Sequence, residues 1–457
     1  MSTLNRREFL GRSQQAGLGL AAGWTILSDP KSVSAAPANE KIILAQVGCG
    51  GRGGGLAPGF VARGDCVYAY CCDPDINRAG GLAKALGSQQ QGSKPPKAVQ
   101  DLRKALDDRS VEAVVIATPD HWHAPATVWA CRAGKDVYVE KPATHSCWEG
   151  QKMVEAARKY QRVVQIGTQN RSAAYNREAR EYLASGKLGK IHFCRIFNQK
   201  DWGNFPWQPD GDPPKGLDWD MWNGPAPLAR YNPTLHGGWH HLWRYSGGDI
   251  ANDASHQIDL ARWLLGVDLP KFVYSTGGRF NATGAAETPD TQVALYDFDN
   301  LLVSFELTLW TPYMLKISPY IRESLTEYPY WPQCATRIEI YGEKGLMIVG
   351  RHGGGWQVLD RPKSEKPVIK AQGNGRFPDP EHKENFVACI RSRQRPNADV
   401  EHGHLSALWI HYANISYRLG GVRLAIDPKT QQIVGNEEAM KLFRREYRKP
   451  WVIEDEV

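Results

Sequence analysis

The chain has 457 residues, of which 42% are hydrophobic and 23% charged, and its formal net charge is +7. That length accommodates two domains with sizeable cores, and the composition is typical of a globular protein rather than a disordered or fibrous one. No lysine- and arginine-rich run of the kind that binds polyanions occurs after residue 38, so we expect no nucleic-acid partner. The nine cysteines are odd in number and contain no Cys-x-x-Cys pair, which predicts buried free thiols.

The first 38 residues have the pattern of a targeting segment. The sequence NRREFL over 5–10 matches a twin-arginine signal, and a mildly apolar stretch follows over 16–27. Such a stretch is too short to cross a bilayer core of roughly 30 Å, so no stable membrane span is expected. We predict export by the twin-arginine route, to the periplasm or an equivalent compartment; a disordered basic tail is the alternative.

Residues 42–55 predict a dinucleotide-binding turn. An apolar strand over 42–47 runs into the pattern Gly-x-Gly-x-x-Gly, which opens a helix. Glycines in this pattern permit the tight turn, let a pyrophosphate approach the backbone and let the helix pack on the strand, while the helix start offers N–H groups to the anion. A glycine-rich turn without a ligand is the alternative. The predicted cofactor contacts here are Gly48, Gly50, Gly51, Arg52 and Gly53.

Strands and helices alternate from residue 41, which predicts a parallel sheet with helices on both faces. The second strand, over 66–72, ends at Asp73, twenty residues after Gly53. A carboxylate at this position accepts hydrogen bonds from the adenine ribose and repels a 2′-phosphate. Asp73 therefore predicts NAD rather than NADP; a simple Asp-Pro turn is the alternative.

The third strand, over 111–117, ends in polar residues that are expected to face the ligand crevice. His121 and His123 have the spacing of a metal-binding pair, but no third ligand lies nearby in the sequence, so no metal is predicted. The cofactor contacts predicted at this strand end are Thr118, Pro119, His121 and His123.

The fourth strand, over 136–139, leads into Glu140-Lys141-Pro142. A lysine at the carboxyl end of a central strand is expected to lie beside the nicotinamide, where desolvation and a neighbouring cation lower its pKa toward neutrality. Lys141 is therefore the predicted proton acceptor, and Glu140 is a predicted cofactor contact. An exposed Glu-Lys pair in a loop is the alternative.

In their order and spacing these motifs resemble the Gfo/Idh/MocA oxidoreductase family. The resemblance implies a Rossmann dinucleotide-binding domain followed by an α/β domain with a large, mostly antiparallel open sheet. It also implies NAD(P)-dependent redox chemistry on sugars, polyols or related compounds. The expected divisions are a signal segment over 1–38, a cofactor domain over 39–167 and a substrate-binding and oligomerisation domain over 168–457. The motifs that carry it are the glycine turn, Asp73, Ala117-Thr118-Pro119, Val139-Glu140-Lys141-Pro142, IGTQNR over 166–171 and LGKI over 188–191.

Residues 201–245 are irregular and rich in Trp, Pro, Gly and His, and a loop of that length is usually functional. Aromatic platforms beside polar groups are typical of carbohydrate sites, although tryptophans also anchor loops and subunit contacts. Both interpretations of the tryptophans remain open. His240, His241 and Arg244 are predicted substrate contacts.

The stretch 247–266 predicts a helix with polar groups on one face, because Asn252, His256 and Asp259 recur at helical spacing. It resembles a helix of the same family, which implies that His256 works with Lys141 at the reacting carbinol; a buried structural histidine is the alternative. The acid expected four residues before the histidine is replaced by Asn252 and displaced to Asp253. The proton relay therefore depends on Asp253 or Asp259, or is simplified. The predicted catalytic residues are Lys141, His256 and Asp253, and the further predicted substrate contacts are Arg171, Asn252 and Asp259.

Alternation of apolar and polar residues over 301–309 predicts an antiparallel strand with one buried face. The resemblance implies that a homo-oligomer covers the other face of its sheet.

We predict an NAD-dependent dehydrogenase of a sugar, polyol or glycoside. The alternatives are a redox-neutral glycoside-modifying enzyme that recycles tightly bound NAD, and a non-catalytic carbohydrate-binding protein. Other strands are expected over 193–199, 271–281, 291–298, 336–341 and 345–349, and helices over 382–391 and 404–419.

Overall fold

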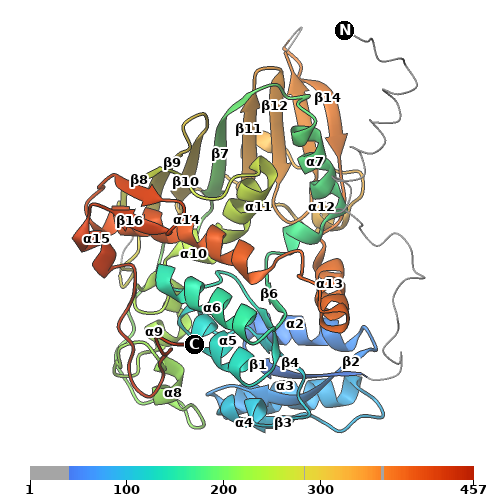
Figure 1. The fold of residues 1–457 in the computed structure, drawn as a ribbon, viewed down its shortest axis with the longest axis vertical. Helices are drawn as coiled ribbons and strands as arrows, with labels where there is room; N and C mark the ends of the chain where they lie inside the picture. The colour runs from blue at the N-terminus through green and yellow to red at the C-terminus, as the bar shows by residue number, and fades with distance from the viewer. Residues whose placement is uncertain (1–40, 282–283, 362–364) are drawn as a thin grey trace, which may run out of the picture. The chain divides into compact units, whose positions relative to one another are not determined.

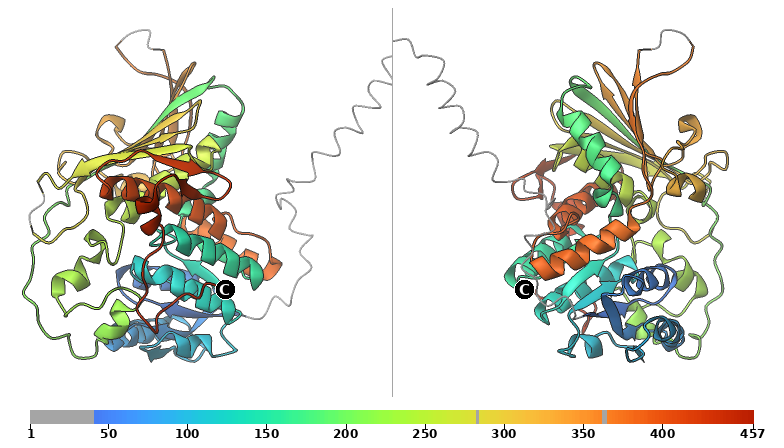
Figure 2. Two further views of the ribbon diagram at one scale, coloured as in Figure 1. Left: turned by 60° about the vertical axis from the view of Figure 1, so that its left-hand side comes forward. Right: turned by 90° about the vertical axis from the view of Figure 1, so that its right-hand side faces the viewer.

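The computed structural model describes residues 41–281, 284–361 and 365–457 (Figure 1). The predicted twin-arginine signal lies outside the described residues. From residue 41 onward the described chain forms one compact unit built on two β-sheets (Figures 1 and 2). No helix in these ranges is long and apolar enough to cross a membrane.

The first sheet is parallel throughout, with the strand order β3-β2-β1-β4-β5-β6. Val47 pairs with Cys72 on one side and with Ile116 on the other, and Ile116 pairs with Val139. The carboxyl ends of four strands therefore meet at one edge, as predicted for a Rossmann sheet. The strands are β1 (Ile42–Val47), β2 (Cys66–Cys72), β3 (Lys97–Val99), β4 (Ala113–Ile116), β5 (Asp136–Val139) and β6 (Val164–Ile166).

Helices cover both faces of this sheet (Figure 1). One of them, α13 (Asp379–Ser392), comes from the C-terminal part of the chain. Its Phe386 ring lies 5.8 Å from the ring of Tyr138 in β5 and 6.2 Å from that of Phe60 in α2. The first sheet therefore takes part of its core from residues far along the chain. The other helices are α2 (Gly51–Val61), α3 (Ile76–Gln89), α4 (Arg103–Leu106), α5 (His123–Arg132) and α6 (Cys147–Lys159).

The second sheet has ten strands in the order β14-β13-β12-β11-β7-β10-β9-β8-β15-β16. Only β7 and β10 among the pairs described run parallel, so the sheet is mostly antiparallel, as predicted. The strands are β7 (Ile191–Gln199), β8 (Phe272–Gly278), β9 (Thr291–Asp297), β10 (Leu302–Thr308), β11 (Arg337–Gly342), β12 (Gly345–Gly350), β13 (Trp356–Asp360), β14 (Val368–Gly373), β15 (Leu424–Asp427) and β16 (Gln432–Val434).

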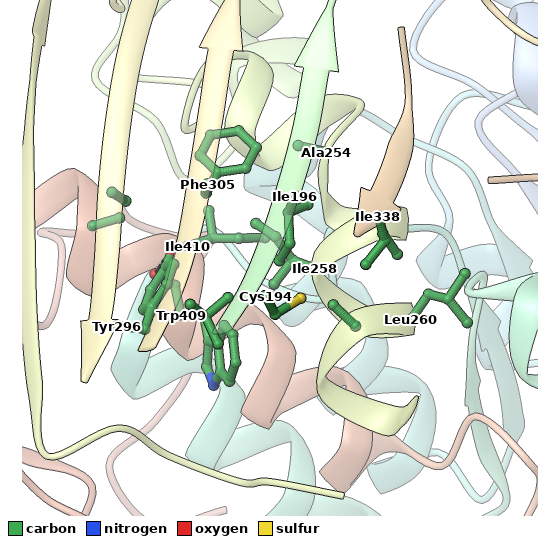
Figure 3. Close-up of a cluster of buried hydrophobic side chains, with 14 of the residues drawn as sticks. Cys194, Ile196, Ala254, Ile258, Leu260, Tyr296, Phe305, Ile338, Trp409 and Ile410 are labelled. Carbon is green, nitrogen blue, oxygen red and sulfur yellow. Dashed lines mark hydrogen bonds between the residues drawn. The ribbon is translucent and has the colours of Figure 1, made fainter. Parts of the chain in front are cut away.

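Helices pack on one face of the second sheet and form its core with the inward side chains of the strands (Figure 3). Phe305 and Ile196 point from the sheet toward Ile258 of helix α11, and Trp409 of α14 packs 4.7 Å from the ring of Tyr296. The alternating apolar positions over 303–309 are buried as predicted, but β10 is antiparallel only to β9 and runs parallel to β7. The helices of this part are α7 (Ala174–Ala184), α10 (Asp249–Asn252), α11 (Ser255–Leu265), α12 (Pro319–Glu323), α14 (Val400–Arg418) and α15 (Glu437–Lys441).

The tryptophan-rich segment 201–245 holds two short helices, α8 (Trp219–Asn223) and α9 (Pro233–Gly237), and an aromatic core of its own. The rings of Trp219 and Trp222 stack with their centroids 4.7 Å apart, and Tyr245 lies 5.0 Å from Trp222. These tryptophans anchor the segment, which is one of the two interpretations left open by the sequence. All nine cysteines are buried and free, as predicted.

Candidate active site

The glycine turn joins β1 to α2 with the backbone geometry that the sequence predicts. Gly48 has φ +84°, and a Cβ atom on it would lie 2.6 Å from the carbonyl oxygen of Ala117. A Cβ atom on Gly53 would lie 1.9 Å from the carbonyl oxygen of Gly48, whereas the space beside Gly51 is open. Side chains are therefore excluded at two positions of the turn, and the helix start is accessible to an anion.

Asp73 is buried at the end of β2 and belongs to the same turn. Its Oδ2 accepts from the backbone N–H of Cys49 at 2.8 Å, and its Oδ1 accepts from that of Asp75 at 2.9 Å. Burial raises the pKa of Asp73, although the two backbone donors oppose the shift. Arg78 lies beside the turn and pairs with Asp75 at 3.5 Å, which places a cation next to the predicted ribose contact.

A short stretch of segment 201–245, residues 215–218, crosses the turn that follows β2; we call it the strap. The backbone N–H of Ile76 donates to the carbonyl oxygen of Gly216 at 3.0 Å. The N–H of Asp218 donates to the carbonyl oxygen of Pro74 at 2.9 Å, and Asp75 forms a β-bridge with Leu217. The strap is therefore fastened to the residues that follow Asp73.

At the end of β4, Thr118, Pro119 and Asp120 line the pocket, but the two histidines after them do not. His121 is buried, with Nε2 3.0 Å from the carbonyl oxygen of Trp222. The ring nitrogens of His123 lie 2.7 and 3.0 Å from the carbonyl oxygens of Pro142 and Thr118. His123 therefore ties two strand ends together instead of lining the pocket as a cofactor contact.

Lys141 projects from the end of β5 toward helix α10. Its Nζ donates to the backbone carbonyl oxygen of Asn252 and lies 3.3 Å from the side-chain Oδ1 of the same residue. Burial lowers the pKa of Lys141, against the opposing effects of Glu140 and Asp253. The amine is therefore moved toward its neutral form, which is the form that accepts a proton.

His256 lies in helix α11 on the same pocket, and its ring packs edge-on against that of His352 at 4.2 Å. Burial lowers the pKa of His256 well below its ordinary value, and the cations Arg351 and Lys141 add to the shift. His256 is therefore neutral at neutral pH. Its Nδ1 is buried and has no hydrogen-bond partner among the residues described, so it is open to a ligand.

Asp253 is the centre of a cluster of charges. Its carboxylate lies 2.6 Å from Arg351 Nη1, 3.2 Å from Lys200 Nζ and 3.0 Å from Lys316 Nζ. Burial alone would raise the pKa of Asp253, but the surrounding cations, Arg351 foremost, outweigh it and hold the pKa well below its ordinary value. A carboxylate held ionised in this way is poorly suited to the proton relay predicted for it.

Glu140 and Arg52 both line the pocket and form an ion pair across the glycine turn. Arg52 Nε donates to Glu140 Oε1 at 2.8 Å, and Arg52 Nη2 lies 3.4 Å from Asp379 Oδ1. The charge of Arg52 is therefore already balanced by carboxylates of the protein.

Arg171 and Asp259 are not among the residues that line the pocket. Arg171 Nε donates to Asp259 Oδ2 at 2.8 Å and its Nη2 to Oδ1 at 2.9 Å, and both side chains are almost fully buried. Ser406 Oγ also donates to this carboxylate, at 2.7 Å. The pair joins elements inside the second part of the chain, so its position indicates a structural role in place of the predicted substrate contact.

The predicted contacts of segment 201–245 also lie behind the pocket. The ring of His240 packs at a tilt against that of Trp202 with the centroids 4.5 Å apart, and burial lowers the pKa of His240 to about 3. The ring of His241 packs against Phe205 at 5.0 Å, and Arg244 is half-buried. None of the three predicted contacts lines the pocket, whereas four other residues of the segment do: Met221, Trp222, His236 and Trp239.

One pocket of about 480 Å³ brings together the glycine turn, Asp73, the ends of β4 and β5, and His256. Its far wall includes residues that the sequence did not single out, Arg322 of α12 and the loop after β12. Sequence reasoning missed them because they belong to no recognisable motif; the run RHGGG over 351–355 was the available signal. The pocket residues that were not predicted include Arg78, Gln100, Asp120, Gln169, Arg322, Arg351, His352 and Phe377, with four residues of segment 201–245.

No group of three metal-binding side chains is found among the described residues. A cofactor of the dinucleotide type fits the turn side of the pocket. The support for this fit is the exclusion of side chains at Gly48 and Gly53, the open helix start and the buried Thr118 Oγ1, which has no partner among the residues described.

A parallel sheet whose glycine turn shares one pocket with a second, mostly antiparallel sheet defines a class of two-part dinucleotide-binding proteins. Three family models match this chain. They are the oxidoreductase family, NAD-binding Rossmann fold, over residues 44–168; the GFO/IDH/MocA C-terminal domain, over 221–348; and the oxidoreductase family, C-terminal alpha/beta domain, over 342–453. The chain belongs to the Gfo/Idh/MocA oxidoreductase family.

Two curated relatives are similar over part of the chain. Levoglucosan dehydrogenase of Pseudarthrobacter phenanthrenivorans is 28% identical over 36% of this chain and 36% of its own length. Inositol 2-dehydrogenase of Rubrobacter xylanophilus is 34% identical over 33% of this chain and 42% of its own length. Each of these two matches thus spans less than half the length of the relative.

The fold is shared with solved structures. The crystal structure of the WlbA dehydrogenase from Bordetella pertussis, in complex with NADH and UDP-GlcNAcA, superposes with a TM-score of 0.59 at 22% sequence identity. The match covers 85% of this chain and 99% of that one. The likeness supports the two-part fold over most of the chain.

Proposed function

We propose that this chain is an NAD-dependent dehydrogenase that oxidises a hydroxyl group of a sugar, polyol or glycoside. The observation that carries the proposal is the single pocket that contains the glycine turn, Lys141 and His256. Two relatives named dehydrogenases of levoglucosan and inositol support a carbohydrate substrate.

In this proposal the turn of Gly48, Gly50 and Gly51 holds the pyrophosphate, and Asp73 accepts hydrogen bonds from the adenine ribose. Both oxygens of Asp73 already accept one backbone hydrogen bond each and keep lone pairs for further donors. Asp73 disfavours a 2′-phosphate, although Arg78 lies close by.

In Asp73→Ala we expect the preference for NAD over NADP to fall about tenfold, in line with the loss of roughly 1.4 kcal/mol of discrimination. The ratio of the two dissociation constants measures this, and an unchanged ratio would show that the ribose contact is misplaced.

Lys141 accepts the hydroxyl proton of the substrate on Nζ as the carbon–hydrogen bond is broken. When bound, NAD would supply the acceptor for that hydrogen and its electron pair, which would leave the carbinol as a carbonyl. His256, neutral and with a free Nδ1, positions the hydroxyl group by a hydrogen bond. Asn252 holds the amine of Lys141 in place.

The direct test is to incubate the purified protein with NAD and a panel of sugars, polyols and glycosides while following the absorbance of reduced nicotinamide. Turnover of a carbohydrate hydroxyl is expected. A protein that binds neither NAD nor NADH would overturn the proposal.

A redox-neutral reaction, in which the same NAD is reduced and reoxidised on one glycoside, is the second candidate. The strap supports it indirectly. It does not line the pocket, but its hydrogen bonds hold the residues that follow Asp73, the predicted ribose contact, and a rigid contact there would slow loss of the cofactor. We propose tight retention of NAD on this basis. Nicotinamide released on denaturing extensively dialysed protein would support retention, and cofactor-free protein after dialysis would contradict it.

We also propose that residues 1–38 direct export by the twin-arginine route. The support is the sequence NRREFL and the apolar stretch that follows it. Replacing both arginines of the motif with lysine should leave the protein in the cytosol, and undiminished export of that variant would contradict the proposal.

A homo-oligomer is proposed from the open face of the second sheet. Tyr274 and Val293 are exposed on neighbouring strands there, and Leu302 lies on the same face of β10. A row of exposed apolar residues on a sheet face is typical of an interface. Light scattering in solution tests this, and a strictly monomeric mass would contradict it.

A further inference from the structure

The wall of the pocket opposite the glycine turn carries an excess of positive charge; we call it the cationic wall. It consists of six of the lining residues that come from the second part of the chain. Among these described residues Arg322 and Arg351 are cations, and Asp253 is the carboxylate. The members of the cationic wall are Asn252, Asp253, His256, Arg322, Arg351 and His352.

The carboxylate of Asp253 does not neutralise this wall, because it is shared. Arg351, Lys200 and Lys316 all lie within 3.2 Å of its oxygens. Lys200 has a second carboxylate, Asp249, at 2.6 Å. With Arg322 included, four cations face three carboxylates, because Glu323 also lies near Arg322, so an excess of one positive charge remains. Lys141, on the opposite side of the pocket, lies near carboxylates of its own, Glu140 and Asp120.

Arg322 is held in place by its backbone and by one side-chain bond. Its Nε donates to the carbonyl oxygen of Ile317 at 3.0 Å, and its own carbonyl oxygen accepts from the N–H of Phe377 at 2.8 Å. Gly353 has φ +90°, and a Cβ atom there would lie 2.8 Å from the Cα of Arg322. In the described part of the chain no hydrogen bond or ion pair joins the terminal nitrogens of Arg322 to the protein. The guanidinium is therefore positioned and still able to bind a ligand.

Two buried histidines add uncharged hydrogen-bonding groups to the same wall. His256 Nδ1 and His352 Nε2 are buried, and neither has a partner among the residues described. Their rings lie 4.2 Å apart, and burial lowers the pKa of both. They are expected to bind hydroxyl groups, which leaves the arginines for an anion.

We propose that the substrate is an anionic sugar, with a carboxylate or phosphate group that binds Arg322 and balances the charge of the cationic wall. This inference rests on the proposed dehydrogenase function and specifies its substrate class. A neutral sugar would remove water from the excess positive charge of the wall and offer no negative charge in its place. Removing water from an unpaired charge is unfavourable in free energy. An anion supplies charge-assisted hydrogen bonds to the guanidinium, in bidentate form for a carboxylate. The pyrophosphate of the cofactor is assigned to the glycine turn, so it does not serve this wall.

The test compares matched sugars that differ in charge: glucose, glucuronate and glucose 6-phosphate, followed by the same trio built on galactose and mannose. Binding of each to the protein with NADH is measured by calorimetry, and kcat/KM with NAD is measured for every sugar that reacts. In at least one trio we expect an anionic member to be preferred over the neutral one by tenfold or more. The preferred anion identifies the group as a carboxylate or a phosphate.

Arg322→Gln should reduce that preference at least tenfold while changing binding of the neutral sugar less than threefold. Arg395→Gln is the matched control, because Arg395 is an exposed arginine paired with Glu401 and does not line the pocket. Three outcomes would each overturn the inference. The protein prefers the neutral sugar in every trio, it binds no anionic sugar selectively, or Arg322→Gln leaves the preference unchanged. NADH binding is measured in the same samples. A protein that binds NADH but does not prefer an anionic sugar contradicts only the inference about the substrate, whereas a protein that does not bind NADH contradicts the proposed function.

Discussion

Lys141 combines a half-buried position, a lowered pKa and a fixed direction for its amine, which are the properties of a general base. Because the neutral amine is the reactive form, kcat/KM for oxidation should rise with pH through the lowered pKa and level off above it. Burial lowers the pKa of His256, so no ionisation of this histidine is expected between pH 6 and 8.

Lys141→Met should lower kcat by about 10²- to 10⁴-fold, the usual contribution of general base catalysis, and abolish the rising limb of the pH profile. NADH binding, measured by fluorescence, should survive because the glycine turn is intact. A variant that keeps both its rate and its pH profile would show that another group accepts the proton.

At the scale of single residues, the sequence singles out most of the turn side of the pocket and half of the cationic wall. Asn252, Asp253 and His256 were predicted, but Arg322, Arg351 and His352 were not. Gly48, Asp73 and Lys141 follow strands whose apolar pattern is plain, so their meeting at one edge can be inferred from parallel pairing. Arg322 lies in the short helix α12 and Arg351 in the loop after β12, and only tertiary packing brings them to the pocket. For the same reason spacing alone cannot separate Arg171, a buried ion-pair partner, from a ligand contact.

The pair Arg171–Asp259 gives a prediction for stability. Arg171→Met leaves a buried carboxylate without its partner, so the free energy of unfolding should fall by about 3–5 kcal/mol. Urea denaturation measures the loss. Adding Asp259→Leu to this variant removes the isolated charge and should recover most of it. A single variant as stable as the parent would contradict the structural role of the pair.

At the scale of elements, sequence patterns fail to predict an edge strand without an apolar run and the packing of a long irregular segment. β14, VIKAQG, has no buried residue and mixes apolar with polar side chains, so it lacks the apolar run that identifies the central strands. Segment 201–245 has no periodicity, and its aromatic core and strap become evident only in the folded chain. The length and composition of this segment indicated a function without locating it.

The strap makes a prediction about cofactor release. Gly216 has φ +96°, and a Cβ atom on it would lie 2.7 Å from Asn77 Nδ2, so Gly216→Val should strain the strap by about 1–3 kcal/mol. We expect NADH to dissociate about tenfold faster, as followed by stopped-flow fluorescence. Gly211→Val is the matched control, because nothing lies within 4 Å of a Cβ atom at that glycine of the same segment. Equal dissociation rates in the two variants would show that the strap does not retain the cofactor.

At the scale of the whole molecule, the two sheets share helices, so the division predicted at residue 167 does not separate two sets of contacts. Helix α13 contributes Phe386, Val387 and Ile390 to the core of the first sheet, whose other members include Leu56 and Phe60. Helix α14 contributes to the cores of both sheets. The order of strands and helices along the chain predicts each sheet and the helices next to it in sequence. It does not predict which helix from a distant part of the chain packs on that sheet.

This sharing predicts that the first sheet is not stable by itself. Phe386, Val387 and Ile390 are at most 7% exposed, and burying three such side chains contributes roughly 5–9 kcal/mol at 1.5–3 kcal/mol each. That amount is comparable to the whole stability of a typical domain, about 5–15 kcal/mol. A fragment over 41–172 should therefore lack a cooperative thermal transition, whereas the chain over 41–457 should unfold in a single one by calorimetry. In the full chain, Phe386→Ala should lower the free energy of unfolding by about 3–5 kcal/mol without splitting that transition. A fragment that unfolds cooperatively, or a second transition in Phe386→Ala, would show that the first sheet folds without α13.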